Sequence, residues 1–196
     1  MTCTITSRGF ELLLALQIAP PERFPKNALS ILKCNLLEIL CALVEKGYTD
    51  FYVNGAYGIP FWSAEMICAL KLYHPALRLH LVQPYPEHNA GWKPELRERF
   101  QQILEKADEV FCAEPEETAD CYEAADRIMC SASDLLVIFG TRSANRSIGL
   151  LCRDAGRAGV FAEMGEPFDS VMKKAAAEIR QLFCVWVSPA WTGTFS

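Results

Sequence analysis

The stretch whose residues are best suited to a chemical role is Asn54 to Gly58, NGAYG. It follows a short run of good strand formers, Phe51 to Val53. Gly55 and Gly58 permit backbone angles and close approaches that a side chain would prevent, and Pro60 suits the first turn of a helix. A strand that leads into a glycine loop and a helix start presents free backbone N–H groups and the positive end of a helix dipole. These groups favour phosphate or another anion, so we predict an anion-binding loop.

The glycine spacing of this loop is not diagnostic by itself. It matches neither the three-glycine dinucleotide fingerprint nor the P-loop with its lysine. A tight connection between a strand and a helix, without any ligand, accounts for the same residues. The other polar loops of the chain are what distinguishes the two interpretations.

The composition of the 196 residues narrows the class of protein. With 51% hydrophobic residues the chain can bury a core, and its length suits one domain over residues 1–196. A net charge of -5 argues against nucleic acid as a partner. The first residues lack the pattern of a signal peptide, and no apolar run reaches the length of a bilayer span, so we expect a cytoplasmic protein that does not bind membranes.

The cysteines and histidines do not predict a metal site or a disulfide framework. The nine cysteines include no CxxC pair, and this pattern is typical of reduced thiols in a cytosolic protein. The histidines, His74, His80 and His88, show no zinc-type spacing. We therefore expect neither a metal nor a cofactor.

Helical and strand patterns alternate along the chain. Strands are predicted at residues 3–6, 51–53, 77–83, 109–113, 134–139 and 159–162, and helices at 27–46, 61–73, 94–106 and 119–131, with two more ending near 156 and 183. Residues 10–26 receive only a loose assignment, and residues 164–196 form a C-terminal extension that is hard to place. The alternation predicts an α/β, Rossmann-like doubly wound fold, with a mainly parallel sheet and helices on both faces.

In such a fold, ligands bind outside the carboxyl ends of the strands. Four polar loops are predicted to lie at this edge of the sheet. They are Thr6 to Gly9, Asn54 to Gly58, Pro84 to Trp92 and Gly140 to Ser147.

Several spacings in residues 2 to 162 match a known family. They comprise Gly55, Gly58, Trp62, Ala64 and Glu65 after the second strand, Pro84 and Trp92 after the third, Asp108 before the fourth, and Arg127 and Ser133-Asp134 before the fifth. In this combination the chain resembles the SLOG superfamily of Rossmann-like proteins, and in particular its YpsA-like branch. The superfamily includes the DNA-processing protein DprA and the LOG-type nucleotide phosphoribohydrolases. The resemblance implies a nucleotide-like ligand at the sheet edge.

The chain departs from the usual pattern of that family at several places. Thr6-Ser7-Arg8 replaces Thr-Gly-His, Asp126 replaces an Asn, His88 replaces a Gln, and Ala144 to Ser147 replace a Gly-Gly-Thr loop. The departures predict that the ligand is altered or lost.

Our leading hypothesis is a sensor or regulatory protein that binds a nucleotide or nucleotide-derived ligand, with weak catalysis or none. The loop backbone would hold a phosphate, arginines would supply charge, and Tyr57 or Trp92 would stack on a base or ribose. The predicted ligand-binding residues are Thr6, Ser7, Arg8, Asn54, Gly55, Ala56, Tyr57, Gly58, Pro84, His88, Trp92, Arg127, Arg142, Ser143, Asn145 and Ser147. For any one arginine a solvated surface position, and for Trp92 a packing role, are the alternatives.

Two other functions stay open. One is hydrolysis at a glycosidic or phosphate bond of a nucleotide, with Glu65, Asp126 or Glu87 as acid or base. The other is a protein-interaction module that has lost its ligand, with the aromatic tail from Val185 to Phe195 as a contact surface. A homo-oligomer is compatible with each of them, whereas DNA binding conflicts with the acidic balance.

Overall fold

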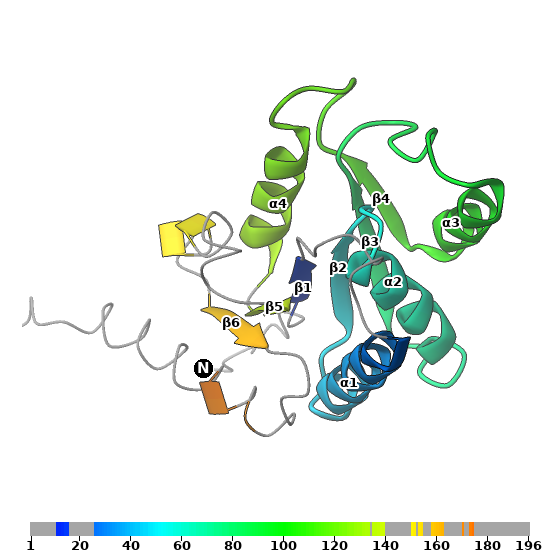
Figure 1. Ribbon diagram of the computed structural model, residues 1–196. Coiled ribbons are helices and arrows are strands. Elements are labelled where there is room, and N and C mark those ends of the chain that lie inside the picture. Colours follow the sequence, from blue (N-terminus) through cyan, green and yellow to red (C-terminus); the bar gives the residue numbers. More distant parts are fainter. Residues whose placement is uncertain are drawn as a thin grey trace, which may run out of the picture.

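The computed structural model describes the backbone of residues 11–15, 26–133, 135–139, 150–151, 153–154, 158–162, 170 and 173–174. Strands and helices alternate, as predicted (Figure 1). The elements are β1 (Glu11–Ala15), α1 (Lys26–Glu45), β2 (Asp50–Asn54), α2 (Ile59–Leu70), β3 (Arg78–Gln83), α3 (Pro94–Lys106), β4 (Glu109–Cys112), α4 (Cys121–Ala132), β5 (Leu135–Phe139) and β6 (Ala158–Ala162).

All six strands pair in parallel, in the order β4-β3-β2-β1-β5-β6. The chain moves outward from β1 to β4 and then returns to the other side of β1 for β5. The strand order therefore reverses between β1 and β5, as in a doubly wound sheet. The predicted fold class is confirmed.

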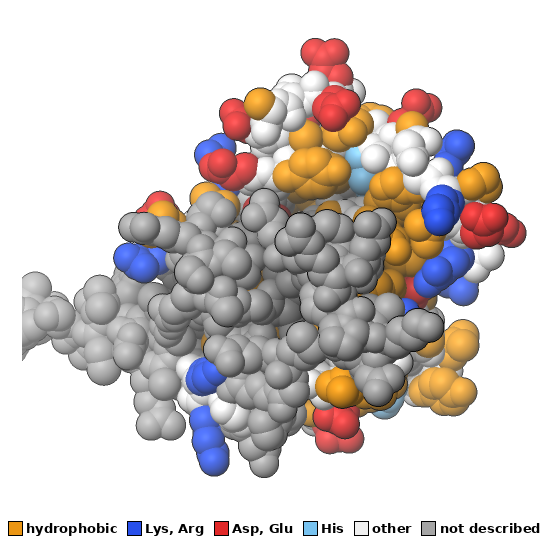
Figure 2. All heavy atoms as spheres, in the orientation of Figure 1, with side chains coloured by type: hydrophobic (Ala, Val, Ile, Leu, Met, Phe, Trp, Pro, Cys, Tyr) orange, Lys and Arg blue, Asp and Glu red, His pale blue; other side chains and the backbone are white. Residues whose placement is uncertain are grey.

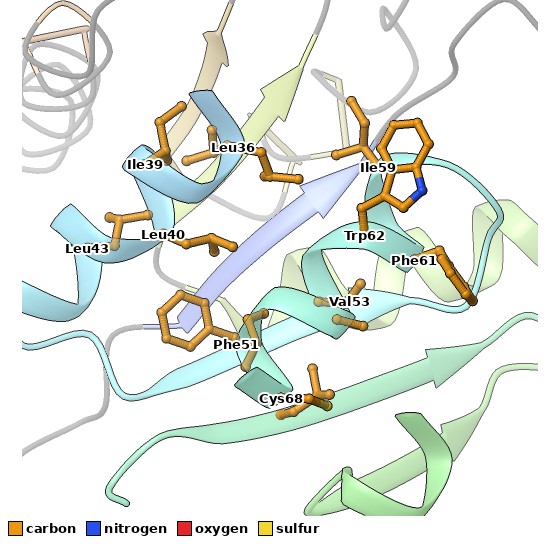
Figure 3. Close-up of a cluster of buried hydrophobic side chains, with 14 of the residues drawn as sticks. Leu36, Ile39, Leu40, Leu43, Phe51, Val53, Ile59, Phe61, Trp62 and Cys68 are labelled. Atoms are coloured by element: carbon orange, nitrogen blue, oxygen red, sulfur yellow. The ribbon is translucent and has the colours of Figure 1, made fainter. Parts of the chain in front are cut away.

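Helices cover both faces of the sheet. Side chains alternate along β2, so Phe51 and Val53 pack with α1 and α2, while Tyr52 on the opposite face packs with the cluster that α4 contributes to. Figure 3 shows the first of these cores, where Leu40 of α1 lies near Phe51 of β2. The continuous apolar character of β5 fits a strand covered on both sides.

The first strand differs from the prediction. The strand that pairs with β2 and β5 is Glu11–Ala15, within the segment that received only a loose assignment, and not residues 3–6. Its ELLLA sequence is nearly all apolar, which suits a strand at the centre of a parallel sheet. Thr6, Ser7 and Arg8 come before this strand in the sequence, and they lie outside the described residues.

The boundaries of the other elements from α1 to β6 agree with the prediction to within a few residues. The ends of the two helices predicted to stop near residues 156 and 183 lie outside the described residues, as does most of the segment 164–196. Asn27 lies inside α1, which begins at Lys26. Gly47 follows the end of that helix with a φ of 91°, and its N–H donates to the carbonyl of Val44. Among the described residues no helix has the length and apolar character needed to cross a membrane.

Candidate functional site

The loop from Asn54 to Gly58 lies at the carboxyl end of β2, where α2 begins. Asn54 is buried and holds the loop through both ends of its amide. Its Oδ1 accepts the N–H of Ala56 at 3.1 Å, and its Nδ2 donates to Oδ1 of Asp126 on α4 at 3.2 Å. This asparagine therefore fixes the turn locally and ties it to the opposite face of the sheet.

The start of α2 carries the glycine and the proline on which the sequence prediction rests. Gly58 precedes the helix with a φ of 113°, which disfavours any residue with a side chain. No side-chain hydrogen bond caps the helix among the described residues, and Pro60 occupies its first turn. Ile59, Pro60 and Phe61 of this turn are buried, and an uncapped helix start of this kind carries the positive end of the helix dipole.

Gly55 is needed for a contact within the protein. A Cβ on this residue would lie 2.8 Å from both Cε1 and Nε2 of His88, and 3.3 Å from Cζ of Phe100. The imidazole of His88 is buried, with Nε2 2.7 Å from the Gly55 carbonyl oxygen and Nδ1 3.3 Å from that of Tyr85. Burial lowers the pKa of His88, although both carbonyl contacts oppose this shift. The predicted ligand residue His88 thus binds the protein's own backbone.

The two predicted stacking residues differ in exposure. Trp92 is half-buried and makes edge contacts with Phe61, His88 and Phe100, with ring centroids 5.4 to 5.8 Å apart. Tyr57 is 44% exposed and touches Trp92 edge-on at 5.6 Å. Packing therefore occupies Trp92, while Tyr57 retains a face that a ligand can approach.

The remaining described residues of the predicted site have partners outside the loop. Pro84 is buried, and its carbonyl accepts the N–H of Glu114. Arg127 is exposed on α4 and pairs with Glu123 one turn earlier. The last four predicted residues, Arg142, Ser143, Asn145 and Ser147, lie outside the described residues.

Asp126 is the titratable group that the fold brings to this loop. Burial raises its pKa to about 6, the hydrogen bond from Asn54 opposes the shift, and the charge of Glu123 adds to it. Spacing alone does not place it here, because the two partners are 72 positions apart. The sequence signal that points to it is its place in the family pattern, where it replaces an Asn just before Arg127.

The other two candidate acids lie elsewhere. Glu65 forms a two-point ion pair with Arg99, at 2.8 Å to Nε and 2.7 Å to a terminal nitrogen, which joins α2 to α3. Glu87 is exposed and lines a hollow of about 560 Å³ beside α3. The sequence interpretation did not identify the other walls of this hollow, including Gln83, Arg97 and Gln101.

Comparison with known proteins finds one matching family model and several similar curated proteins. The model of the YspA SLOG family, YpsA, matches residues 24–150. A UPF0398 protein of Halalkalibacterium halodurans is 35% identical over 69 residues, which are 35% of this chain and 36% of that protein. A UPF0398 protein of Bacillus anthracis (strain A0248) is 30% identical over 100 residues, 50% of this chain and 54% of that protein. The chain spans between about a third and a half of the length of these curated relatives.

Proposed function

The chain belongs to the YspA SLOG family, and from this premise we propose that it binds a nucleotide or nucleotide-derived ligand at the carboxyl end of its parallel sheet. The observation that carries the proposal is the anchored loop of Asn54 to Gly58, which leads into a helix start that no described side chain caps. Such a helix start favours a phosphate. The position also agrees with the edge at which open α/β sheets bind ligands.

The residues around the loop suggest an orientation for the ligand. A phosphate at the N–H groups of Gly58 and Ile59 would leave the base or ribose near the exposed face of Tyr57. Asp126 would lie on the α4 side, where its carboxylate is suited to accept hydrogen bonds from hydroxyl groups. The proposed role is that of a sensor or regulator that responds to the bound molecule.

Isothermal calorimetry against AMP, ADP, ADP-ribose and NAD tests this proposal. We expect at least one of them to bind, and Tyr57→Ala to weaken that ligand by about 5- to 100-fold, because base stacking on an aromatic ring contributes about 1–3 kcal/mol. Tyr73→Ala is the matched control, since Tyr73 is 81% exposed and lies just beyond the opposite end of α2. The proposal fails if no nucleotide binds, or if both variants bind with the affinity of the parent.

Hydrolysis of the N-glycosidic bond of a nucleotide is a second candidate, favoured by Asp126. A carboxyl group with a pKa near 6 next to a ligand loop is suited to exchange protons at neutral pH. Incubation with nucleoside monophosphates would then release free base and ribose phosphate, and Asp126→Asn would abolish the release. Glu65→Gln is a less informative variant, because Glu65 is engaged by Arg99.

A further inference from the structure

A concave site lies at the same edge of the sheet, between the segment that follows β3 and one side of α3. Its volume of about 560 Å³ falls within the range of small-molecule sites. The imidazole of His88 and the ring of Phe100 pack against Gly55, and none of these three residues lines the hollow. The hollow is therefore a separate place from the Asn54 to Gly58 loop.

The walls combine opposite charges with amide groups. One acidic residue, one basic residue and three amides contribute, over an aliphatic patch that includes a leucine packed against the core. They are Glu87, Arg97, Gln83, Asn89, Gln101 and Leu104. Each amide carries both hydrogen-bond donors and acceptors, so these walls suit a polar ligand with groups of both kinds.

The two charges of the hollow are not neutralised by each other. Within the described part of the chain, no ion pair joins Glu87 or Arg97 to another side chain. Arg97 lies in the first turn of α3, where the helix dipole adds to its positive charge. One wall therefore attracts an anionic group and another wall attracts a cationic group.

The backbone conformation of Glu87 supports a functional role. Its φ of 57° is the only positive value at a non-glycine residue in the described chain. A residue with a Cβ adopts this conformation only at a cost in backbone strain. The turn enforces it, since the Glu87 carbonyl accepts the N–H of Ala90 at 2.7 Å. Glycine would relieve this cost, but it would remove the carboxylate from the wall of the hollow.

We propose that the hollow between residues 86–89 and α3 binds a zwitterion of amino-acid to dipeptide size, with its carboxylate at Arg97 and its ammonium group at Glu87. The amides of Gln83, Asn89 and Gln101 hydrogen-bond the peptide or side-chain amide of the ligand. This site stands independently of nucleotide binding, because it shares neither the loop after β2 nor the start of α2.

Calorimetry with L-glutamine and glycyl-L-glutamine as probes tests the assignment. We expect at least one probe to bind the full chain. Its N-acetyl derivative, which lacks the ammonium group, and its methyl ester, which lacks the carboxylate, should each bind at least 10-fold more weakly. Tyr57→Ala should leave both probes unaffected, so that a failure of nucleotide binding and a failure of this site are distinguishable.

Two charge-removing variants locate the two ends of the ligand. Glu87→Gln should weaken binding of the zwitterion at least 10-fold without further weakening binding of the N-acetyl derivative. Arg97→Gln should likewise weaken binding of the zwitterion at least 10-fold without further weakening binding of the methyl ester. Arg78→Gln, an exposed arginine at the amino end of β3, is the matched control and should change nothing. Absence of binding by both probes overturns the proposal, as does binding that neither Glu87→Gln nor Arg97→Gln reduces.

Discussion

At Gly55, a hydrogen atom in place of a side chain leaves room for the imidazole of His88. The glycine of the loop therefore serves the packing of the protein, whereas Gly58 is required by its own φ of 113°. Two positions only three residues apart thus require glycine for different physical reasons. Only the second of them belongs to the open helix start that we propose as the phosphate site.

Gly55→Ala should destabilise the protein by about 1–3 kcal/mol, because its Cβ would overlap the His88 ring. In a His88→Ala background the same substitution should cost less than about 1 kcal/mol, since the overlapping ring is gone. Urea denaturation of the four proteins measures this coupling. Gly91→Ala is the control, since its Cβ meets nothing within 4 Å. Equal costs in both backgrounds would disprove the role assigned to His88.

Asp126 is the residue whose ionisation opposes folding. Its pKa is about 6 in the folded protein against an ordinary value of 3.8, so the folded state binds the proton more tightly than the unfolded state. The destabilising contribution of Asp126 has its full size above about pH 6, shrinks as the pH falls, and is absent below about pH 3.8.

Asp126→Asn should therefore stabilise the protein at pH 7 by about 1–3 kcal/mol, because the amide carries no charge and still accepts the hydrogen bond from Asn54. The difference between variant and parent should decline between pH 6 and 4. Thermal and urea unfolding across that range provide the measurement. A variant that is less stable than the parent at pH 7 would contradict the role of burial here.

At the scale of elements, polar contacts hold the edge strand β4 to the sheet. All four of its residues are exposed, so few apolar contacts attach it. His80 on β3 lies between two carboxylates, with Nε2 3.0 Å from Asp50 of β2 and Nδ1 2.9 Å from Glu109 of β4. Its ring also stacks on Tyr52 at 4.3 Å. One buried imidazole thereby connects three adjacent strands.

His80→Ala should cost about 2–4 kcal/mol of unfolding free energy, since it removes both contacts and leaves the Asp50 carboxylate without this partner. Amide hydrogen exchange should accelerate most in β4. His74→Ala, at an exposed position, is the control and should have little effect. If exchange in β4 is unchanged, other contacts hold the strand.

A second contact between elements accounts for Asp108, one of the residues of the family pattern. Asp108, just before β4, accepts hydrogen bonds from the backbone N–H of Leu79 at 2.7 Å and from Nζ of Lys71 at 2.5 Å. Burial raises the pKa of this carboxyl, but the hydrogen bonds from Lys71 and Leu79 together with the charges of Lys71 and His80 outweigh burial, so that the pKa is lowered. Asp108 thus joins the end of α2 to β3 and has no contact with the proposed ligand loop.

For the whole molecule, the strand order brings both proposed sites to one edge. Parallel strands place the loops after β2 and β3 at the same end of the sheet, so the anion loop and the hollow are neighbours. Figure 2 shows acidic side chains at the top of the view, whereas basic and acidic side chains occur together at its right side. The segment between β4 and α4 carries Glu114, Glu116, Glu117 and Asp120. Charge along the edge is therefore uneven, despite the modest net charge of -5.

Local patterns in the sequence predict much of this architecture. Periodicity, glycine stops and prolines at helix starts depend on a few neighbouring residues, so α1 to α4 and β2 to β5 are found close to their predicted places. The same locality explains the error at β1, because a short apolar run before a proline-rich segment has no distinctive period. That Glu11–Ala15 forms a strand depends on its pairing with β2 and β5.

The sequence by itself determined the parallel α/β class, the family spacing and the glycine loop that opens α2. Only the tertiary structure decided what the polar residues do: His88 binds Gly55 across 33 positions, Arg99 engages Glu65 across 34, and Asn54 meets Asp126 across 72. The physical reason is the separation along the sequence between the residues that interact. Turns and helix ends follow from adjacent residues, whereas hydrogen bonds between distant side chains exist only after the sheet and its helices have packed.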